Sequence, residues 1–399
     1  MPAPGAFADR GTDIERRPTT SNDVQRCPTT SNDVQRRPTT SNRVFTREKH
    51  GVAQHGGVLE NVSPALAASW IAVATNEELG DGPLQVWALG EPWMVARVGA
   101  ARTLVAFADR CPHRLAPISA GRIVDDQIEC AYHGWRFDTE GRPAAIPALG
   151  DGATLPPRAC LRSVAAVAEH LGLIWIAIED PLAPLPILSG ASEPGALMAR
   201  CEIVRTPASA VQLIDNFMDA AHFPFVHAAT FGVPDAFEVS SDEIVRQDWL
   251  VRSTFSAPYQ HHDDPLVATG EHPLVQDHTV TKVGYAGCNA SLELRFPLTR
   301  GVFGIVYACQ PETATSTRIY KVMARNDVDA SGMERCVKDE DAILQEDLAI
   351  LERYTTMNLM TDLTVEVHTR ADRLSVAWRR LMSDMQHHPR HGIARDTVA

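Results

Sequence analysis

The sequence lacks several features that define other classes of protein. Its formal charge is −13, and the excess of acidic residues lies outside residues 1–50, which hold nine Lys and Arg against six Asp and Glu. A nucleic-acid-binding surface is therefore not expected. The longest strongly apolar run, Leu171–Ile178, is far too short to cross a bilayer, and no apolar signal region follows Met1. These absences predict a soluble cytoplasmic protein with no nucleic-acid or membrane partner.

Cysteine is also scarce, and a glycine-rich nucleotide-binding motif is absent from the sequence. Eight cysteines are scattered over 399 residues, too few for a disulfide scaffold, so thiol or metal chemistry is the better expectation. The sequence contains no Gly-x-Gly-x-x-Gly motif for a dinucleotide. The sequence therefore gives no sign that the chain binds a dinucleotide itself.

The N-terminal segment is repetitive. Residues 17–26, 27–36 and 37–46 are near-copies of one decapeptide, and each copy offers little more than one Val to a core. Because so little apolar surface cannot offset the entropy of ordering a chain, we predict a disordered tail over residues 1–58. A second flexible tail is predicted over residues 387–399.

The remaining chain predicts two domains. From residue 65 to 180, short β-rich runs are separated by Gly, Pro and Asp, which is typical of a small antiparallel β domain. A Pro-rich linker at 181–186 leads to a second region, 187–386, with a helical segment near 208–227 and a long helix near 331–354. Alternating runs at 292–296 and 302–309 lie between these helical segments, so the predicted fold class is α+β with an antiparallel sheet.

The strongest motif is Cys111-Pro-His113 followed, sixteen residues later, by Cys130-Ala-Tyr-His133. Two Cys and two His in this alternating order suit a Rieske [2Fe–2S] centre, in which two thiolates hold one iron and two imidazoles the other. A structural zinc site is the alternative, but its usual spacing pairs Cys with Cys and His with His. The order of the ligands therefore favours the cluster.

A second motif lies in the α+β region, as Asn216-Phe-Met-Asp219-Ala-Ala-His222-Phe-Pro-Phe-Val-His227. Two His and a carboxylate form the facial triad that leaves open positions on Fe(II). Residues five apart diverge on an unbroken helix, so we expect Pro224 to interrupt the helix and let His222 and His227 converge. Asp219 could orient a His ring, conduct an electron or cap a helix.

The third ligand should be an acid in the segment 331–354. Asp347 lies among Ile343, Leu344, Ile350 and Leu351, and an unpaired acid in such an apolar stripe is costly. Glu346 has similar surroundings, and periodicity leaves the two acids open. Asp341, beside Lys338 and Gln345, is expected to be solvated, and so is the loop His261-His262-Asp263-Asp264.

The order of these motifs, with a late Ile-Leu-x-Glu-Asp-Leu helix, resembles the oxygenase alpha subunits related to vanillate and dicamba O-demethylases, over about residues 65–385. The resemblance implies a Rieske β-sandwich domain and a helix-grip-like catalytic domain. It makes Cys111, His113, Cys130 and His133 the cluster ligands. It also selects Asp347 over Glu346 as the third iron ligand, with His222 and His227.

The resemblance further implies one [2Fe–2S] cluster and one Fe(II) per subunit of a head-to-tail homotrimer. Asp219 then connects a neighbouring subunit's Rieske histidine with the iron site. A ferredoxin or flavin reductase would supply electrons from NAD(P)H for O₂-dependent mono-oxygenation, as hydroxylation or O- or N-demethylation of a small aromatic or apolar substrate. Phe217, Phe225, Phe231 and Phe237 are candidate pocket residues.

Two alternatives stay open at the level of the sequence. Arene cis-dihydroxylation uses the same two centres as mono-oxygenation. A Rieske protein for electron transfer or redox sensing would need the cluster alone.

Overall fold

The computed structural model describes residues 57–388 except 234, 240–242, 263 and 357. The decapeptide repeats, and most of both predicted tails, lie outside the described residues. Within the predicted N-terminal tail, Val58 is described and belongs to strand β1 (Val58–Leu59), which pairs with β20 (Leu359–Met360). In the described residues, no helix combines the length and apolar character needed to span a membrane.

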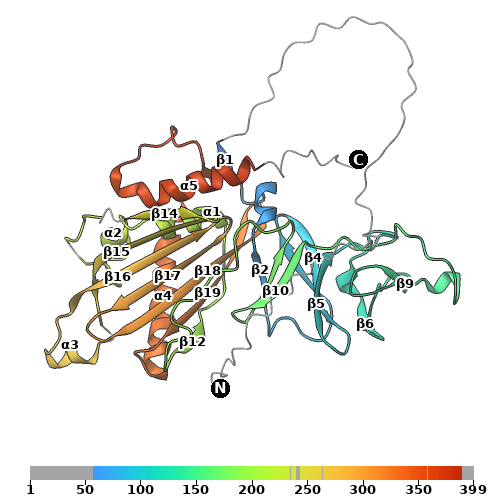
Figure 1. The fold of residues 1–399 in the computed structure, drawn as a ribbon. Helices are drawn as coiled ribbons and strands as arrows, with labels where there is room; N and C mark the ends of the chain where they lie inside the picture. The colour runs from blue at the N-terminus through green and yellow to red at the C-terminus, as the bar shows by residue number, and fades with distance from the viewer. Residues whose placement is uncertain (1–56, 234, 240–242, 263, 357, 389–399) are drawn as a thin grey trace, which may run out of the picture.

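The first half of the chain forms three small antiparallel sheets, as the β-rich runs predicted. Their strands are β2 (Ile71–Thr75), β10 (Ala166–His170) and β11 (Leu173–Ala177) in one sheet, β3 (Leu84–Ala88), β4 (Glu91–Val98) and β5 (Thr103–Ala108) in the second, and β6 (Arg122–Val124), β7 (Gln127–Glu129), β8 (Arg136–Phe137) and β9 (Pro143–Ala145) in the third. Short 3₁₀ helices at 64–68, 118–120 and 147–149 connect them. The β6 to β9 sheet lies at the end of the molecule farthest from the larger sheet (Figure 1).

The second half is built on one eight-stranded antiparallel sheet. Its strands are β12 (Leu197–Arg200), β13 (Val204–Thr206), β14 (Ile244–Gln247), β15 (Leu250–Gln260), β16 (Val275–Tyr285), β17 (Asn289–Phe296), β18 (Gly301–Thr313) and β19 (Ser316–Arg325). The helices are α1 (Ala210–Met218), α2 (Phe223–Val226), α3 (Pro265–Thr269), α4 (Ala330–Leu351) and α5 (Arg373–Gln386), with a 3₁₀ turn at 370–372. The predicted α+β class and antiparallel sheet are confirmed.

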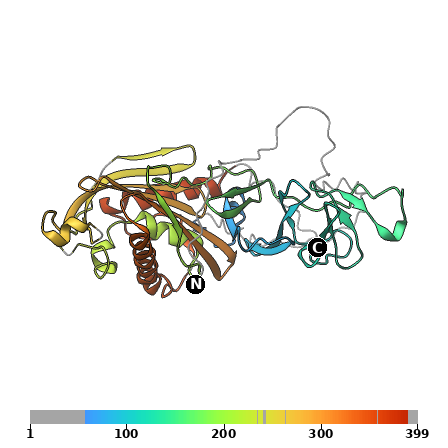
Figure 2. The ribbon, with the colours of Figure 1, turned by 90° about the horizontal axis from the view of Figure 1, so that it is seen from below.

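The two faces of this sheet are buried against different partners. The strand register sets Lys282, Leu292, Ile305 and Met323 side by side on one face, which we call the inner face. Side chains from α1, α4 and α5 share a core with the inner face, and α4 runs along the sheet in Figures 1 and 2. The other face of β18 and β19 packs against Trp175 and its neighbours in the β2, β10 and β11 sheet. Burial on both faces explains why nearly every position of β18 is buried.

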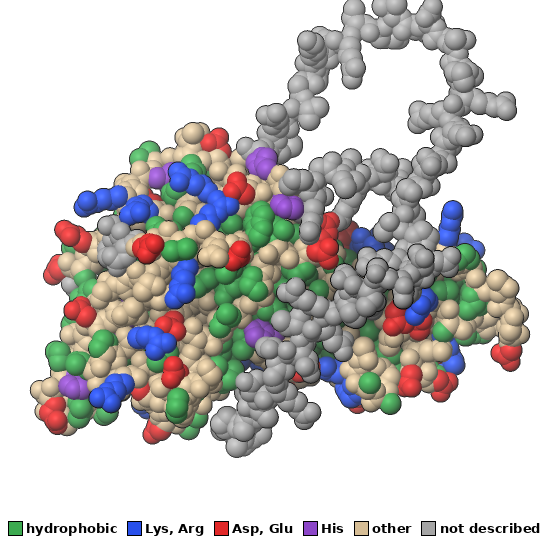
Figure 3. Space-filling model, in the orientation of Figure 1, with side chains coloured by type: hydrophobic (Ala, Val, Ile, Leu, Met, Phe, Trp, Pro, Cys, Tyr) green, Lys and Arg blue, Asp and Glu red, His purple; other side chains and the backbone are tan. Residues whose placement is uncertain are grey.

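Capping residues fix where the helices begin. The Ser209 hydroxyl accepts a hydrogen bond from the backbone N–H of Gln212 at the start of α1, and Asp329 accepts one from Gly332 at the start of α4. Helix α4 carries Asp347, and α1 leads into the segment that holds Asp219, His222 and His227. On the face drawn in Figure 3, described Lys and Arg side chains are interspersed with Asp and Glu.

Candidate functional site

The two Cys-His motifs form a pair of similar turns. The backbone N–H of Leu115 donates to the carbonyl of Cys111, and the N–H of Gly134 donates to that of Cys130. Both turns close through a left-handed residue, with φ of 58° at Leu115 and 67° at Gly134. Each turn places its Cys inside and its His two or three residues later near the loop tip.

The four side chains of these turns lie together. The Cys111 and Cys130 thiols are buried and free, and the rings of His113 and His133 are 4.4 Å apart between centroids. Burial, with the neighbouring Cys130 thiol, raises the pKa of Cys111 to about 11. The Nδ1 atom of His113 is buried without a hydrogen-bond partner in the described part of the chain. Two adjacent thiols and an unpartnered imidazole nitrogen fit a metal cluster, because metal binding stabilises thiolates and uses that lone pair.

The segment that carries the second motif is broken between α1 and α2, but not where the sequence predicted. Helix α1 ends at Met218, and Asp219 is extended, with its Oδ1 accepting from the N–H of Ala221 at 3.0 Å. This side-chain turn competes with the next helical hydrogen bond. Pro224 lies in the first turn of α2, where a missing N–H costs little. The interruption therefore precedes Pro224 and is formed by residues 219–222.

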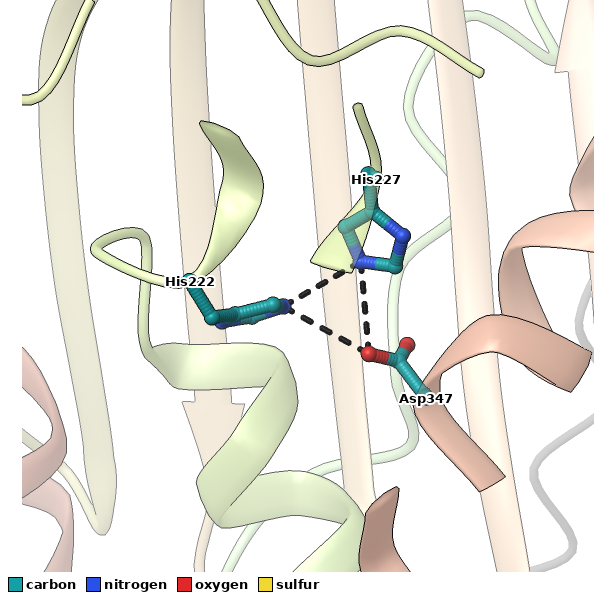
Figure 4. A group of neighbouring side chains, drawn as sticks. All are labelled: His222, His227 and Asp347. Carbon is teal, nitrogen blue, oxygen red and sulfur yellow. Dashed lines mark hydrogen bonds and ion pairs between the residues drawn. The ribbon is translucent and has the colours of Figure 1, made fainter. Parts of the chain in front are cut away.

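Three ligand atoms converge beyond this break (Figure 4). The Nε2 atoms of His222 and His227 are 3.2 Å apart, and they lie 3.5 and 3.2 Å from Oδ1 of Asp347 on α4. With metal–ligand bonds of about 2.1 Å, neighbouring atoms on an octahedral face are about 3.0 Å apart. The three atoms are thus close to the spacing of one face of a metal's coordination sphere. In the described residues, they are the one group of three or more His, Cys, Asp or Glu found at such spacing.

Carboxylates on the far side of each ring set the imidazole tautomers. Nδ1 of His222 donates to Oδ2 of Asp219 at 3.0 Å, and Nδ1 of His227 donates to Oε2 of Glu346 at 2.8 Å. With hydrogens on both Nδ1 atoms, each neutral ring presents a lone pair at Nε2. Two lone pairs facing each other repel unless a cation lies between them, so the donor set fits a bound metal ion.

The electrostatics of Asp347 also favour a cation. Burial raises the pKa of Asp347, but the close approach of the His222 and His227 imidazoles outweighs burial and holds the pKa at about 2. Asn216 donates from its side-chain amide to the same Oδ1 atom at 3.3 Å. The carboxylate is therefore ionised and held in place at neutral pH.

The structure separates the two acids that periodicity left open. Asp347 faces the Nε2 atoms, whereas Glu346 reaches the outer side of His227 and also accepts a hydrogen bond from Thr230. The apolar stripe around Asp347 is narrower than expected, because Ile350 is 47% exposed. The expectation for Asp341 is wrong, since its carboxylate lies 3.2 Å from the buried ammonium of Lys321.

The candidate pocket residues divide into two pairs. Phe217 packs against Tyr307 of the inner face, and Phe231 stacks on His227 with centroids 4.9 Å apart. Phe225 and Phe237 are instead exposed and stack on each other. Their prediction as pocket residues is wrong, because α2 turns Phe225 outward.

In the loop at 261–264, the expectation of solvated side chains is borne out for His262, which is exposed, and is wrong for His261 and Asp264. His261 and Asp264 are buried, and the Asp264 carboxylate binds Nδ1 of His272 at 2.7 Å and the amide of Gln276 at 2.8 Å. It also caps α3 by accepting from the N–H of Leu266. Composition gave the wrong expectation for Asp264 because its carboxylate is bound by residues that lie close to it in the sequence.

Two loops of alternating Cys and His, joined to an α+β domain with a two-His, one-carboxylate group, define the class of Rieske-type oxygenases. Comparison with known proteins gives the same class. Residues 69–163 match the Rieske [2Fe–2S] domain, and residues 206–387 match the vanillate O-demethylase oxygenase C-terminal domain. The chain belongs to this family of two-domain Rieske oxygenases, whose Rieske domain implies a [2Fe–2S] cluster.

Individual relatives cover most of the chain. Methylxanthine N1-demethylase NdmA of Pseudomonas putida is 25% identical over 331 residues, which is 81% of this chain and 90% of NdmA. The structure of NdmA with caffeine matches with a TM-score of 0.70, covering 82% of this chain and 93% of that one. The vanillate O-demethylase oxygenase subunit of a Pseudomonas species is 34% identical over 173 residues, which is 41% of this chain and 49% of that protein.

Two features of the site were not predicted from the sequence: the contact between Glu346 and His227, and the position of Lys282. The pairing of Glu346 with His227 carries no local signal, because the residues are 119 positions apart. Lys282, on the inner face beside Phe217 and Asp219, does carry one. Its place between Val280 and Gly284 in an alternating strand puts a charged residue on the buried side.

Proposed function

We propose that this chain is the oxygenase component of a multicomponent enzyme that uses O₂ to mono-oxygenate a small aromatic or similarly apolar molecule. The observation that carries the proposal is the convergence of two imidazole nitrogens and one carboxylate oxygen within 3.5 Å of one another. That donor set is typical of non-haem Fe(II) oxygenases.

The proposed cluster ligands are Cys111, His113, Cys130 and His133, and the proposed ligands of one Fe(II) are His222, His227 and Asp347. When bound at these residues, the cluster supplies single electrons and the Fe(II) supplies open coordination positions for O₂. The two groups together account for both domains of the chain.

The protein's own side chains prepare the second site. Asp219 and Glu346 hold the two imidazoles in the tautomer that directs Nε2 inward. Phe223 packs edge-to-face on the ring of His222, and Phe231 stacks on the ring of His227. These apolar rings limit the access of water and give an aromatic substrate a surface to contact.

Electron delivery is proposed to run between subunits of a head-to-tail homotrimer. The turn of Cys130 and His133 joins β7 to β8 in the β6 to β9 sheet, which lies at the opposite end of the molecule from α2 (Figure 1). His133 is exposed at that end, and the side chain of Asp219 keeps 27% of its surface exposed. Asp219 can therefore accept a hydrogen bond from the Rieske histidine of a neighbouring subunit. A ferredoxin or flavin reductase, using NAD(P)H, is the proposed electron donor.

The relatives support demethylation or hydroxylation as the reaction, because their names describe an N-demethylase of methylxanthines and an O-demethylase of vanillate. In such a reaction one oxygen atom enters a C–H bond, while two electrons and two protons reduce the other atom to water. A hydroxylated methyl group on nitrogen or oxygen then breaks down and releases formaldehyde.

The test is a substrate screen with a surrogate reductase that follows oxygen uptake and product mass. A gain of one oxygen or a loss of CH₂ supports mono-oxygenation, whereas a gain of two oxygens and two hydrogens identifies cis-dihydroxylation. The variant His222→Ala should keep the visible and EPR spectra of the cluster and lose product formation. Turnover by this variant at the wild-type rate would contradict the proposed site and favour a protein that only carries electrons.

A further inference from the structure

Lys282 is a buried cation that forms no direct ion pair with any carboxylate of the described residues, although the charges of Asp219 and Asp347 lie near enough to raise its pKa. It is 2% exposed and projects from the inner face of β16. Two other buried cations of that face are neutralised at short range, Lys321 by Asp341 at 3.2 Å and Arg325 by Asp327 at 2.7 Å. Among the described residues, no carboxylate lies within ion-pair distance of Lys282. Because burying an unpaired charge is costly, the contacts that it makes instead require an explanation.

These contacts all fall on the segment that joins α1 to α2. The ammonium donates to the backbone carbonyls of Phe217 and Asp219, each at 2.7 Å. Phe217 is in the last turn of α1 and Asp219 is its C-cap, so the cation lies where the helix dipole is negative and carbonyls are unsatisfied. The face of the Phe223 ring lies 4.5 Å from the same ammonium, at the start of α2. One side chain thus contacts both ends of the break at 219–222.

We infer that Lys282 is a positioning residue that fixes the backbone between α1 and α2, and with it the placement of Asp219 and His222 at the metal site. Within this break, few other bonds hold the backbone, since Ala221 bonds to the Asp219 side chain and the Phe223 N–H reaches Ala220 at 3.4 Å. Burial lowers the pKa of Lys282 to about 8, which leaves it mostly protonated at neutral pH.

The test measures metal affinity rather than turnover, and it rests on the proposed metal site. The protein retains its cluster, the other iron is removed with a chelator, and Co(II) binding is measured by anaerobic equilibrium dialysis with mass spectrometry. Mass spectrometry distinguishes the bound cobalt from the iron of the cluster, so the cluster does not interfere with the measurement. Lys282→Met, which keeps the shape but removes the donors and the charge, should weaken Co(II) binding about 10- to 100-fold, the range known for groups that orient metal ligands.

Lys321→Met is the matched control, because Lys321 is equally buried on the same face but contacts Asp341 and the carbonyl of Glu340. It should lower the thermal midpoint while leaving the Co(II) affinity within about threefold of wild type, because it does not touch the 219–222 break. Wild-type affinity in Lys282→Met, or equal losses in both variants, would overturn the inference. If Lys282→Met does not fold, Lys282→Gln retains one amide donor, and wild-type affinity in that variant also overturns it.

His222→Ala separates this inference from the proposed function. Loss of Co(II) binding in His222→Ala, together with wild-type affinity in Lys282→Met, rejects only the role of Lys282. Undiminished Co(II) binding in His222→Ala rejects the metal site itself.

Discussion

The imidazole of His227 is held from behind by Glu346, whose Oε2 accepts the Nδ1 hydrogen at 2.8 Å. Glu346 directly precedes Asp347, and successive residues on a helix diverge by about 100°. The two acids of α4 therefore reach the same imidazole from different sides, one at Nδ1 and the other at Nε2. Two neighbouring residues of α4 therefore position His227. Glu346 fixes the orientation of the imidazole ring, and Asp347 faces its Nε2 atom.

Substitutions of Glu346 should weaken metal binding, and the loss of the acceptor oxygen should weaken it more than the loss of the negative charge alone. Glu346→Ala leaves a buried Nδ1–H without its acceptor, and we expect Co(II) affinity to fall about 10- to 100-fold. Glu346→Gln keeps an acceptor oxygen but loses the charge, so its loss should be smaller. Equilibrium dialysis checks the order, with Glu334→Ala on the exposed side of α4 as the control. Equal affinity in wild type and Glu346→Ala would show that the contact does not orient the ligand.

Asp219→Asn should separate metal binding from electron delivery. Asn can still accept from Nδ1 of His222, so iron content and the Rieske EPR signal should stay near wild type. Product formation should be nearly abolished, because the charged acceptor offered to a neighbouring subunit is gone. The comparison is metal analysis and product yield against Asp277→Asn, an exposed position on β16. Normal turnover in Asp219→Asn would remove this residue from the electron path.

Local spacing explains which parts of these sites could be predicted from the sequence. The Cys-His turns and the pair of His222 and His227 lie within a few residues of one another, so the order of residue types indicates the chemistry. The acid that completes the second group comes from another helix, and periodicity could not choose between Glu346 and Asp347. Both acids point toward the site, so burial alone does not distinguish them.

The fold, like the sites, was predicted where the signal is local in the sequence and missed where it depends on distant residues. Alternating runs and turn residues predicted short strands in the first half and, in the second half, only β17 and part of β18. Helical periodicity predicted the long helix α4, which spans Ala330–Leu351. The break after Met218 was misplaced, because the signal was a side-chain turn at Asp219 rather than Pro224. Long-range pairs such as that of Lys321 with Asp341 were missed, since they depend on how α4 packs against the sheet.

Cys130→Ser should remove the cluster and spare the second site. Replacing one of the two proposed thiolate ligands should abolish the visible colour and the Rieske EPR signal. The Cys130 turn lies between β7 and β8, whereas His222 and Asp347 lie at α2 and in α4, so Co(II) affinity at the second site should stay within about twofold. Spectroscopy and dialysis on one preparation check both statements. A cluster signal that survives in Cys130→Ser would exclude this residue as a ligand.

The Asp264 network should stabilise the far end of the sheet in a pH-dependent way. Burial raises the pKa of Asp264, but hydrogen bonds from Gln276, His272 and the N–H of Leu266 outweigh it and hold the pKa below its ordinary value. A carboxyl group with a lowered folded pKa stabilises the protein above its unfolded pKa of about 3.9, and this contribution disappears as the pH falls through the folded value. Asp264→Asn keeps a capping side chain but loses the charge, so at pH 7 it should reduce the free energy of unfolding by about 1–3 kcal/mol. Urea unfolding between pH 7 and pH 3 should show the difference from wild type constant down to about pH 5 and shrinking below pH 4. A difference that grows toward low pH would mean that the carboxylate does not stabilise this network.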